Sequence, residues 1–133
     1  MLRARDVMNR NVISVKKDTP IFEAIELMVS NSVSGLPVVN DDLTIAGILS
    51  EKDAVVLFYT NKDDENKTVD DFMTHHPVFF EEHESLFVVC DFLTKNIFRR
   101  VPITSNGKLV GIISVQDVLD SVLKQRQQTA HAT

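Results

Sequence analysis

The 133-residue sequence lacks the features of membrane, secreted and nucleic-acid-binding proteins. No apolar run reaches the roughly 18 residues that a membrane span needs, and the charged N-terminus has no apolar stretch of a signal peptide. The formal net charge of −5 argues against the basic face that nucleic-acid binding usually requires. We therefore expect a cytoplasmic protein that binds neither membrane nor nucleic acid. The composition, 44% apolar and 25% charged, suits one compact globular protein.

Motifs of catalysis and metal binding are also scarce. The single cysteine, Cys90, cannot form an internal disulfide, and its place on a predicted helix face favours core packing over thiol chemistry. The sequence has no Walker-type glycine loop and no paired zinc-ligand spacing. His75, His76 and His83 lie near three glutamates and offer ligands for a metal. They fall in an extended loop and an acidic turn, so we favour a solvated acidic loop over a metal site. Because the sequence has no catalytic motif, we expect neither an enzyme nor a cofactor.

Two stretches of the chain repeat each other. Leu-Pro-Val at 36–38 and Gly-Ile-Leu-Ser-Glu-Lys-Asp at 47–53 return as Val-Pro-Ile at 101–103 and Gly-Ile-Ile-Ser-Val-Gln-Asp at 111–117. The prolines lie 65 residues apart and the glycines 64. Because only two copies exist, we expect tandem halves packed on a pseudo-two-fold axis rather than a solenoid. Each half is near the lower size limit for a self-sufficient core.

Both copies have the predicted element order β-α-β-β-α. The cap before the first long helix is assigned to Asp18-Thr19-Pro20, with the proline at the first helical position. The expected ranges are 12–15, 21–30, 36–39, 45–49 and 50–58 in the first copy, and 78–80, 85–96, 101–104, 109–113 and 114–123 in the second. The chain divides into a first repeat (1–60), an exposed connector (61–68), a second repeat (69–124) and a polar tail (125–133), which we expect to be disordered.

The duplicated pattern resembles a tandem pair of cystathionine beta-synthase (CBS) domains, known as a Bateman module. The resemblance covers about residues 5 to 123 and depends most on the hydrophobic-Pro-hydrophobic strand followed by Gly-hydrophobic-hydrophobic-Ser-x-x-Asp. It implies an α/β fold of two β-α-β-β-α repeats. It also implies a regulatory module that binds an adenosine-containing molecule of the AMP, ADP, ATP, S-adenosylmethionine or NAD type in a cleft between the repeats. Such modules commonly form homodimers, here through the amphipathic helices, and regulate a protein partner.

The two Ser-x-x-Asp sequences match the ribose-binding part of the family pattern. By resemblance, Asp53 and Asp117 accept hydrogen bonds from the ribose hydroxyls, and Ser50 and Ser114 reach the ribose or a phosphate. A carboxylate has two acceptor oxygens and can engage both hydroxyls of a cis diol. Ser-x-x-Asp is also the sequence of a helix capping box. The local sequence leaves both roles open, and they are compatible.

The residues before the second proline strand distinguish the two copies. Arg99 and Arg100 stand where the first copy has Ser34 and Gly35. In the family a basic residue there often reaches a ligand phosphate, and a guanidinium suits that geometry. The alternative is a pair of solvated surface arginines. Gly35 permits a close backbone approach, so the first site is either empty or binds a neutral part of a ligand.

The predicted first strands complete the candidate site. By resemblance, Ile13 and Ser14 in one copy and Val78 and Phe79 in the other contact the base. Phe79 or Phe80 can stack on adenine, although a Phe pair in a strand is more often core. We align Phe80 with Ser14, where the family often has a small hydroxyl residue. This alignment predicts that the second site lacks that hydroxyl contact.

Two other functions are consistent with the sequence. A structural or dimerisation module with vestigial sites predicts no binding of adenosine ligands. A small metal-dependent enzyme predicts turnover that is lost on chelation. The two aspartates and the arginine pair favour the ligand-binding module over the structural module.

Overall fold

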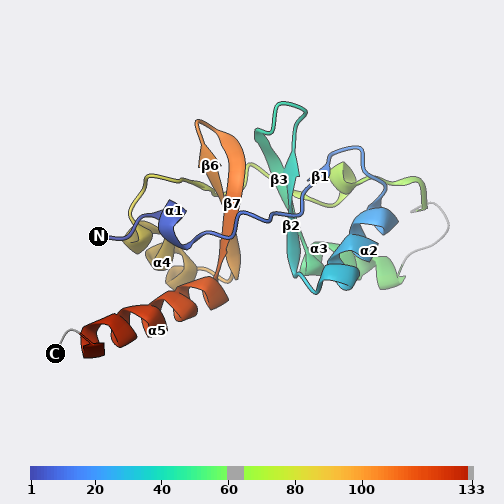
Figure 1. Ribbon diagram of the computed structural model, residues 1–133. Coiled ribbons are helices and arrows are strands. Elements are labelled where there is room, and N and C mark those ends of the chain that lie inside the picture. Colours follow the sequence, from blue (N-terminus) through green and yellow to red (C-terminus); the bar gives the residue numbers. More distant parts are fainter. Residues whose placement is uncertain (60–64, 132–133) are drawn as a thin grey trace. The chain divides into compact units, whose positions relative to one another are not determined.

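The computed structural model describes residues 1–59 and 65–131, and for 130 and 131 the backbone alone. The chain folds into two compact units, which are coloured by sequence in Figure 1. We call residues 13–77 the first-repeat unit, and residues 1–12 together with 78–133 the second-repeat unit. The predicted α/β fold of two β-α-β-β-α repeats is confirmed. The units differ from the predicted linear segments because residues 1–12 belong with the second repeat.

The first-repeat unit is a four-stranded sheet with helices. The sheet order is β1-β2-β3-β4, in which β1 is parallel to β2 and the other pairs are antiparallel. Its elements are β1 (Val15–Lys16), α2 (Ile21–Asn31), β2 (Gly35–Val39), β3 (Ile45–Ser50), α3 (Glu51–Val55), the 3₁₀ helices η1 (Val56–Tyr59) and η3 (Val69–Asp71), and β4 (Thr74–His75).

The second-repeat unit has the same β-α-β-β-α order, joined by α1 from the N-terminal segment. Its sheet, β5-β6-β7, pairs β5 parallel to β6 and β6 antiparallel to β7. Its elements are α1 (Ala4–Val7), β5 (Phe80–Glu81), α4 (Leu86–Lys95), β6 (Arg100–Ser105), β7 (Lys108–Ser114) and α5 (Val115–His131).

The first strand of each repeat begins later than expected, and this changes the alignment of the copies. Val15 pairs with Val38 in the first repeat, whereas Phe80 pairs with Ile103 in the second. Val38 and Ile103 are equivalent positions 65 residues apart, so Phe80 corresponds to Val15. The alignment of Phe80 with Ser14 is therefore wrong. The residue at the position of Ser14 is Phe79.

Two predictions at helix ends are also wrong. Pro20 is the N-cap of α2, and no side chain caps that helix, because the Thr19 hydroxyl instead accepts a hydrogen bond from the backbone N–H of Lys16 at 3.0 Å. The polar tail is helical as far as His131, the last residue described. Gln, Lys and Arg are good helix formers, and no Gly or Pro ends α5 before that point. Of the predicted connector, residues 61–64 lie outside the described residues.

Each sheet buries the apolar faces of its helices. The predicted apolar face of α2 is buried at Ile21, Ala24 and Met28. On α4, Val89 is buried and Cys90 is half-buried. Burial raises the pKa of the Cys90 thiol above its ordinary value. In the described part of the chain, no helix combines the length and apolar character needed to cross a membrane.

The segment that precedes each repeat packs on the hairpin of the other repeat. Ala4 and Met8 belong to the core of the second-repeat unit, and Asn9 pairs with Ile112 on β7 through N–H···O bonds of 2.8 and 3.0 Å. In the first-repeat unit, Met73 joins the core and β4 pairs with β3. The equivalent sequences Asp-Val-Met at 6–8 and Asp-Phe-Met at 71–73 are thus exchanged between the repeats.

Candidate functional site

Strand register brings the predicted residues of the second repeat to one end of its sheet. Arg100 lies opposite Ser114 across β6 and β7, and the Val115 N–H donates to the Arg99 carbonyl at 2.9 Å. Helix α5 begins directly after β7, so Asp117 lies in its first turn. Because β5 runs parallel to β6, the residues just before β5 lie toward this same end. These are Val78 and Phe79.

Asp117 forms the capping box that its sequence predicts. Its Oδ2 accepts hydrogen bonds from the backbone N–H and hydroxyl of Ser114, at 2.8 and 3.0 Å. The Asp117 N–H donates in return to the Ser114 Oγ at 3.1 Å. Within residues 1–59 and 65–131, Oδ1 of Asp117 accepts no hydrogen bond. One carboxylate oxygen caps the helix while the other is available, because the side chain is only half-buried.

The first repeat has the same arrangement around Asp53. Its Oδ2 accepts from the Ser50 N–H at 2.9 Å, and its own N–H donates to the Ser50 Oγ at 3.2 Å. Gly35 lies opposite Ser50, and the Glu51 N–H donates to the Ser34 carbonyl at 2.8 Å. The predicted equivalence of the arginine pair with Ser34 and Gly35 is therefore confirmed by the register. Among the described residues, Oδ1 of Asp53 also accepts no hydrogen bond.

The capping bond by itself does not mark a binding site. Asp6 Oδ2 accepts from the Arg3 N–H at 2.7 Å, and Asp71 Oδ2 accepts from the Thr68 N–H at 2.9 Å. Neither follows a hairpin strand. What distinguishes Asp53 and Asp117 is their place at the sheet end beside the other predicted site residues.

The two arginines differ in exposure. The Arg99 side chain is exposed, and that of Arg100 is half-buried. Among the described residues Arg99 forms no ion pair. A guanidinium that is exposed at this end of the sheet can meet an anion in solution.

The structure separates the roles of the two adjacent phenylalanines. Phe80 packs in the core, edge-to-face with Phe92 at a centroid distance of 5.7 Å. Phe79 is 40% exposed and Val78 is 47% exposed, so these two side chains are accessible. In the first repeat, Ile13 and Ser14 are half-buried, and Ile13 packs on the core.

The histidines do not gather into a metal centre in the part of the chain that the structure describes. His75 Nε2 lies 3.2 Å from Asp70 Oδ1, and both side chains are exposed. No group of three or more His, Cys, Asp or Glu side chains in the described ranges has metal-binding geometry.

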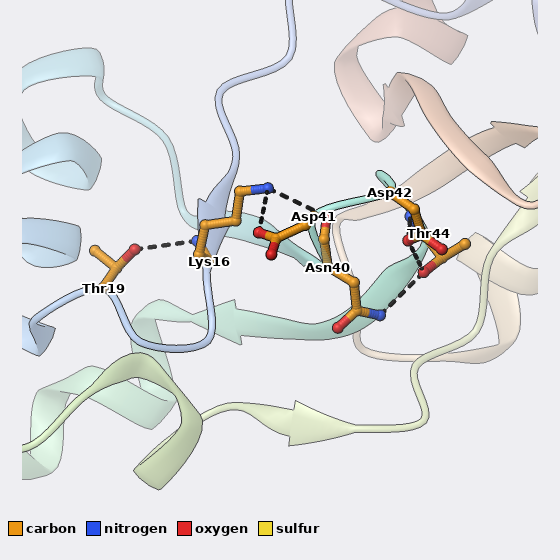
Figure 2. A network of polar contacts seen from close by, with 6 residues as sticks. All are labelled: Lys16, Thr19, Asn40, Asp41, Asp42 and Thr44. Carbon is orange, nitrogen blue, oxygen red and sulfur yellow. Dashed lines mark hydrogen bonds and ion pairs between the residues drawn. The ribbon is translucent and has the colours of Figure 1, made fainter.

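The opposite end of each sheet carries a polar clamp that the sequence analysis missed. Lys16 Nζ lies 3.2 Å from the Asn40 carbonyl and 3.4 Å from Asp41 Oδ1 (Figure 2). In the second repeat the equivalent residue is Glu81, whose carboxylate accepts from the N–H groups of residues 106 and 107 at 3.0 and 2.8 Å. The sequence could have indicated these contacts only through the position of each residue opposite a hairpin turn. That position is known only once the strand register is known.

Comparison with known proteins identifies related sequences and folds. The CBS domain family model matches residues 4–59 and 69–124. The uncharacterized protein MJ1225 of Methanocaldococcus jannaschii is 37% identical over 115 residues, which make up 86% of this chain and 41% of that protein. Bacillus subtilis YlbB is 30% identical over 119 residues, covering 89% of this chain and 80% of YlbB.

Solved structures share the fold. The crystal structure of Arabidopsis thaliana CBSX2 in complex with AMP has a TM-score of 0.86 at 30% identity, covering 95% of this chain and 99% of that chain. In the sequence comparison the aligned part spans 64% of the full CBSX2 sequence. The chain thus spans less than two thirds of both MJ1225 and CBSX2.

Proposed function

Because the chain belongs to the CBS domain family, with two domains in tandem, we propose that it is a regulatory module that binds an adenosine-containing molecule. The AMP complex of CBSX2, a protein of the same fold at 30% identity, supports this class of ligand. The ligand acts by binding one conformation of the module more tightly than another. The module itself is proposed to be cytoplasmic and to have no catalytic activity.

The observation that carries the proposal is that only one of the two oxygens of each motif carboxylate caps a helix. In both Asp53 and Asp117, Oδ2 accepts the capping hydrogen bond, and Oδ1 accepts no hydrogen bond among the described residues. A ribose hydroxyl can donate to Oδ1 without breaking the cap. The capping and ligand-binding roles of Ser-x-x-Asp are therefore compatible at the level of single atoms.

The remaining site residues are assigned by their places around these carboxylates. In the second repeat, Arg99 and Arg100 bind a phosphate, and the Ser114 Oγ, whose proton is donated to Asp117, accepts from a ribose hydroxyl. The base lies against Val78 and Phe79, whose side chains are accessible. In the first repeat, the equivalent contacts come from Ile13, Ser14 and Ser50.

The test is isothermal titration of the full chain with AMP, comparing Asp117→Ala with Asp6→Ala. Both variants lose a bond from the carboxylate to a backbone N–H in the same unit, but only Asp117 lies at the proposed site. A hydrogen bond to a charged group contributes about 1.5–3 kcal/mol, so Asp117→Ala should weaken AMP about 10-fold or more. Asp6→Ala should leave the affinity unchanged.

Two outcomes would contradict the proposal. If Asp117→Ala lowers the unfolding temperature without changing AMP affinity, the motif is only a helix cap. If AMP, ADP, ATP, S-adenosylmethionine and NADH all fail to stabilise the wild-type protein, a structural module is favoured. A ligand at 100 times its dissociation constant should add about 2.7 kcal/mol to the free energy of unfolding.

We also propose that the module is a homodimer whose interface is formed by its helices. Large apolar side chains are exposed on α4 and α5, including Phe87 at 73%, Leu119 at 52% and Leu123 at 59%. Exposed apolar surface of this kind is usual at interfaces between subunits. Light scattering of the purified chain measures the mass directly, and a monomer at high concentration would rule the dimer out.

A further inference from the structure

We infer that the two repeats select adenosine ligands of different charge. The second-repeat site binds a ligand with a negatively charged phosphate, whereas the first-repeat site binds an adenosine whose 5′ substituent is neutral or positively charged. This inference rests on the proposed function, because it divides the proposed ligands between the two sites.

The first observation is the unequal charge of the two units. All six arginines of the chain belong to the second-repeat unit. That unit has nine Lys and Arg and seven Asp and Glu, a formal charge of +2. The first-repeat unit has five lysines and twelve Asp and Glu, a formal charge of −7. The excess negative charge of the protein thus lies entirely in the first-repeat unit, whose field disfavours anions.

The second observation is the same difference at the two sheet ends. The register and the paired backbone bonds make Ser34 equivalent to Arg99, and Gly35 equivalent to Arg100. They also make Glu51 equivalent to Val115. The two arginines of the second site therefore have neutral counterparts in the first site. The apolar Val115 has the acidic counterpart Glu51.

The local charges agree with the charges of the units. At the first sheet end, Glu51, Lys52 and Asp53 have a combined formal charge of −1. At the second sheet end, Arg99 and Arg100 exceed Asp117 by one, so the formal charge is +1. A difference of two charges beside otherwise similar carboxylate sites reverses the sign of the preferred ligand group.

Packing disfavours a side chain, and with it a cation, at Gly35. A Cβ atom there would lie 3.1 Å from the Leu49 carbonyl oxygen, which belongs to the neighbouring strand β3. Any side chain at this position requires that backbone oxygen to move by a few tenths of an ångström. The first site therefore keeps the acceptor oxygen of Asp53 for a ribose but has no guanidinium for a phosphate.

The experiment is isothermal titration of the full chain with AMP and with adenosine, at low salt. We expect one AMP and two adenosine molecules per chain. Asp53→Ala should lower the adenosine stoichiometry to one. Replacing Arg99 and Arg100 together by Ala should weaken AMP about 10-fold or more and adenosine less than about 3-fold. Arg126→Ala, which removes an exposed arginine of α5 in the same unit, is the control for general charge.

A gain of function tests the first site directly. Glu51→Lys should raise the AMP stoichiometry from one to two, whereas Glu26→Lys, the same charge change on an exposed position of α2, should not. Circular dichroism checks that each variant is folded.

The outcomes separate the inference from the proposed function. Two equal AMP sites in the wild type, a single adenosine site, or an unchanged AMP stoichiometry in Glu51→Lys would overturn the inference while leaving adenosine binding intact. Failure of both AMP and adenosine to bind would overturn the inference together with the proposed function.

Discussion

The two motif glycines make a sharp test of the packing, because they are equivalent in sequence but not in surroundings. A Cβ atom at Gly47 would lie 2.6 Å from the Thr74 carbonyl oxygen and 2.7 Å from Met73 Sδ. At Gly111 it would lie 2.5 Å from Met8 Sδ and 2.8 Å from Met8 Cγ. The new methyl group would thus meet both backbone and side-chain atoms at Gly47, but only side-chain atoms at Gly111. We therefore predict that Gly47→Ala destabilises the protein more than Gly111→Ala.

The expected magnitudes follow from what must move. At Gly111, a rotation of the flexible Met8 side chain relieves the contacts with Sδ and Cγ and leaves only the Met8 Cβ contact at 3.0 Å, so the cost is about 1 kcal/mol, the low end of overpacking. At Gly47, strand β4 must shift as well, because Thr74 pairs with Ile48 on β3. Overpacking and weakened strand hydrogen bonds together cost about 3 kcal/mol. The loss of unfolded-state entropy on going from Gly to Ala is common to both variants and cancels in the comparison.

The assay is thermal and urea unfolding followed by far-UV circular dichroism, since the chain has no tryptophan. For 133 residues, an unfolding entropy of about 2.1 cal/mol/K per residue gives about 0.28 kcal/mol/K. The melting temperature should then fall by roughly 11 °C in Gly47→Ala and roughly 4 °C in Gly111→Ala.

Double variants test whether the new methyl groups meet the atoms named above. Met8→Ala should cost less in the Gly111→Ala background than in the wild type, because it removes Sδ and Cγ, the two atoms that lie nearest to the new methyl group. Met73→Ala should not rescue Gly47→Ala, since the Thr74 carbonyl remains in place. Equal costs for the two glycine variants, or rescue of Gly47→Ala by Met73→Ala, would refute the reasoning.

Two further predictions concern single side chains. Glu81→Ala should lower the free energy of unfolding by about 2 kcal/mol, because two backbone N–H groups lose their acceptor. Lys16→Ala should lower it by less than about 1 kcal/mol, because the ion pair of Lys16 is exposed. Equal losses of the two variants in urea unfolding would contradict this prediction. Burial raises the pKa of the Cys90 thiol above its ordinary value, so the thiolate is scarcer in the folded protein, and a disulfide reagent should react more slowly with the folded than with the unfolded protein. The folded thiol keeps its proton to higher pH than the unfolded one, so this group's contribution to stability is present below the pKa of the unfolded thiol and is lost as the pH rises through the raised pKa of the folded one.

The sequence predicted the parts of the fold that local patterns determine. Both hairpins and the helix over residues 21–31 form close to the expected positions, since apolar periodicity and turn residues are local signals. Both Ser-x-x-Asp motifs form the expected capping boxes, because Ser and Asp need only be three residues apart.

The errors in the first strands and in the segments before the repeats have a different origin. The first strands contain only two residues each, and their register depends on pairing with β2 and β6, which lie more than twenty residues away. A shift of one residue in the alignment of Ser14 was therefore invisible in the local sequence. The exchange of the segments at 1–12 and 65–77 was hidden for the same reason, because each segment packs on a hairpin that is distant in sequence.

The two clamps show how the repeats diverged while keeping one architecture. Lys16 and Glu81 occupy the same register position, yet their charges are opposite. The reason lies in the turns that they meet. The first turn presents the Asn40 carbonyl and the Asp41 carboxylate, which attract an ammonium group. The second turn, with Asn106 at φ 52° and Gly107 at φ 82°, directs two N–H groups at the clamp, and these require an acceptor. The charge of each clamp residue is therefore matched to the groups of the turn that it contacts and is opposite in sign to the formal charge of its own unit.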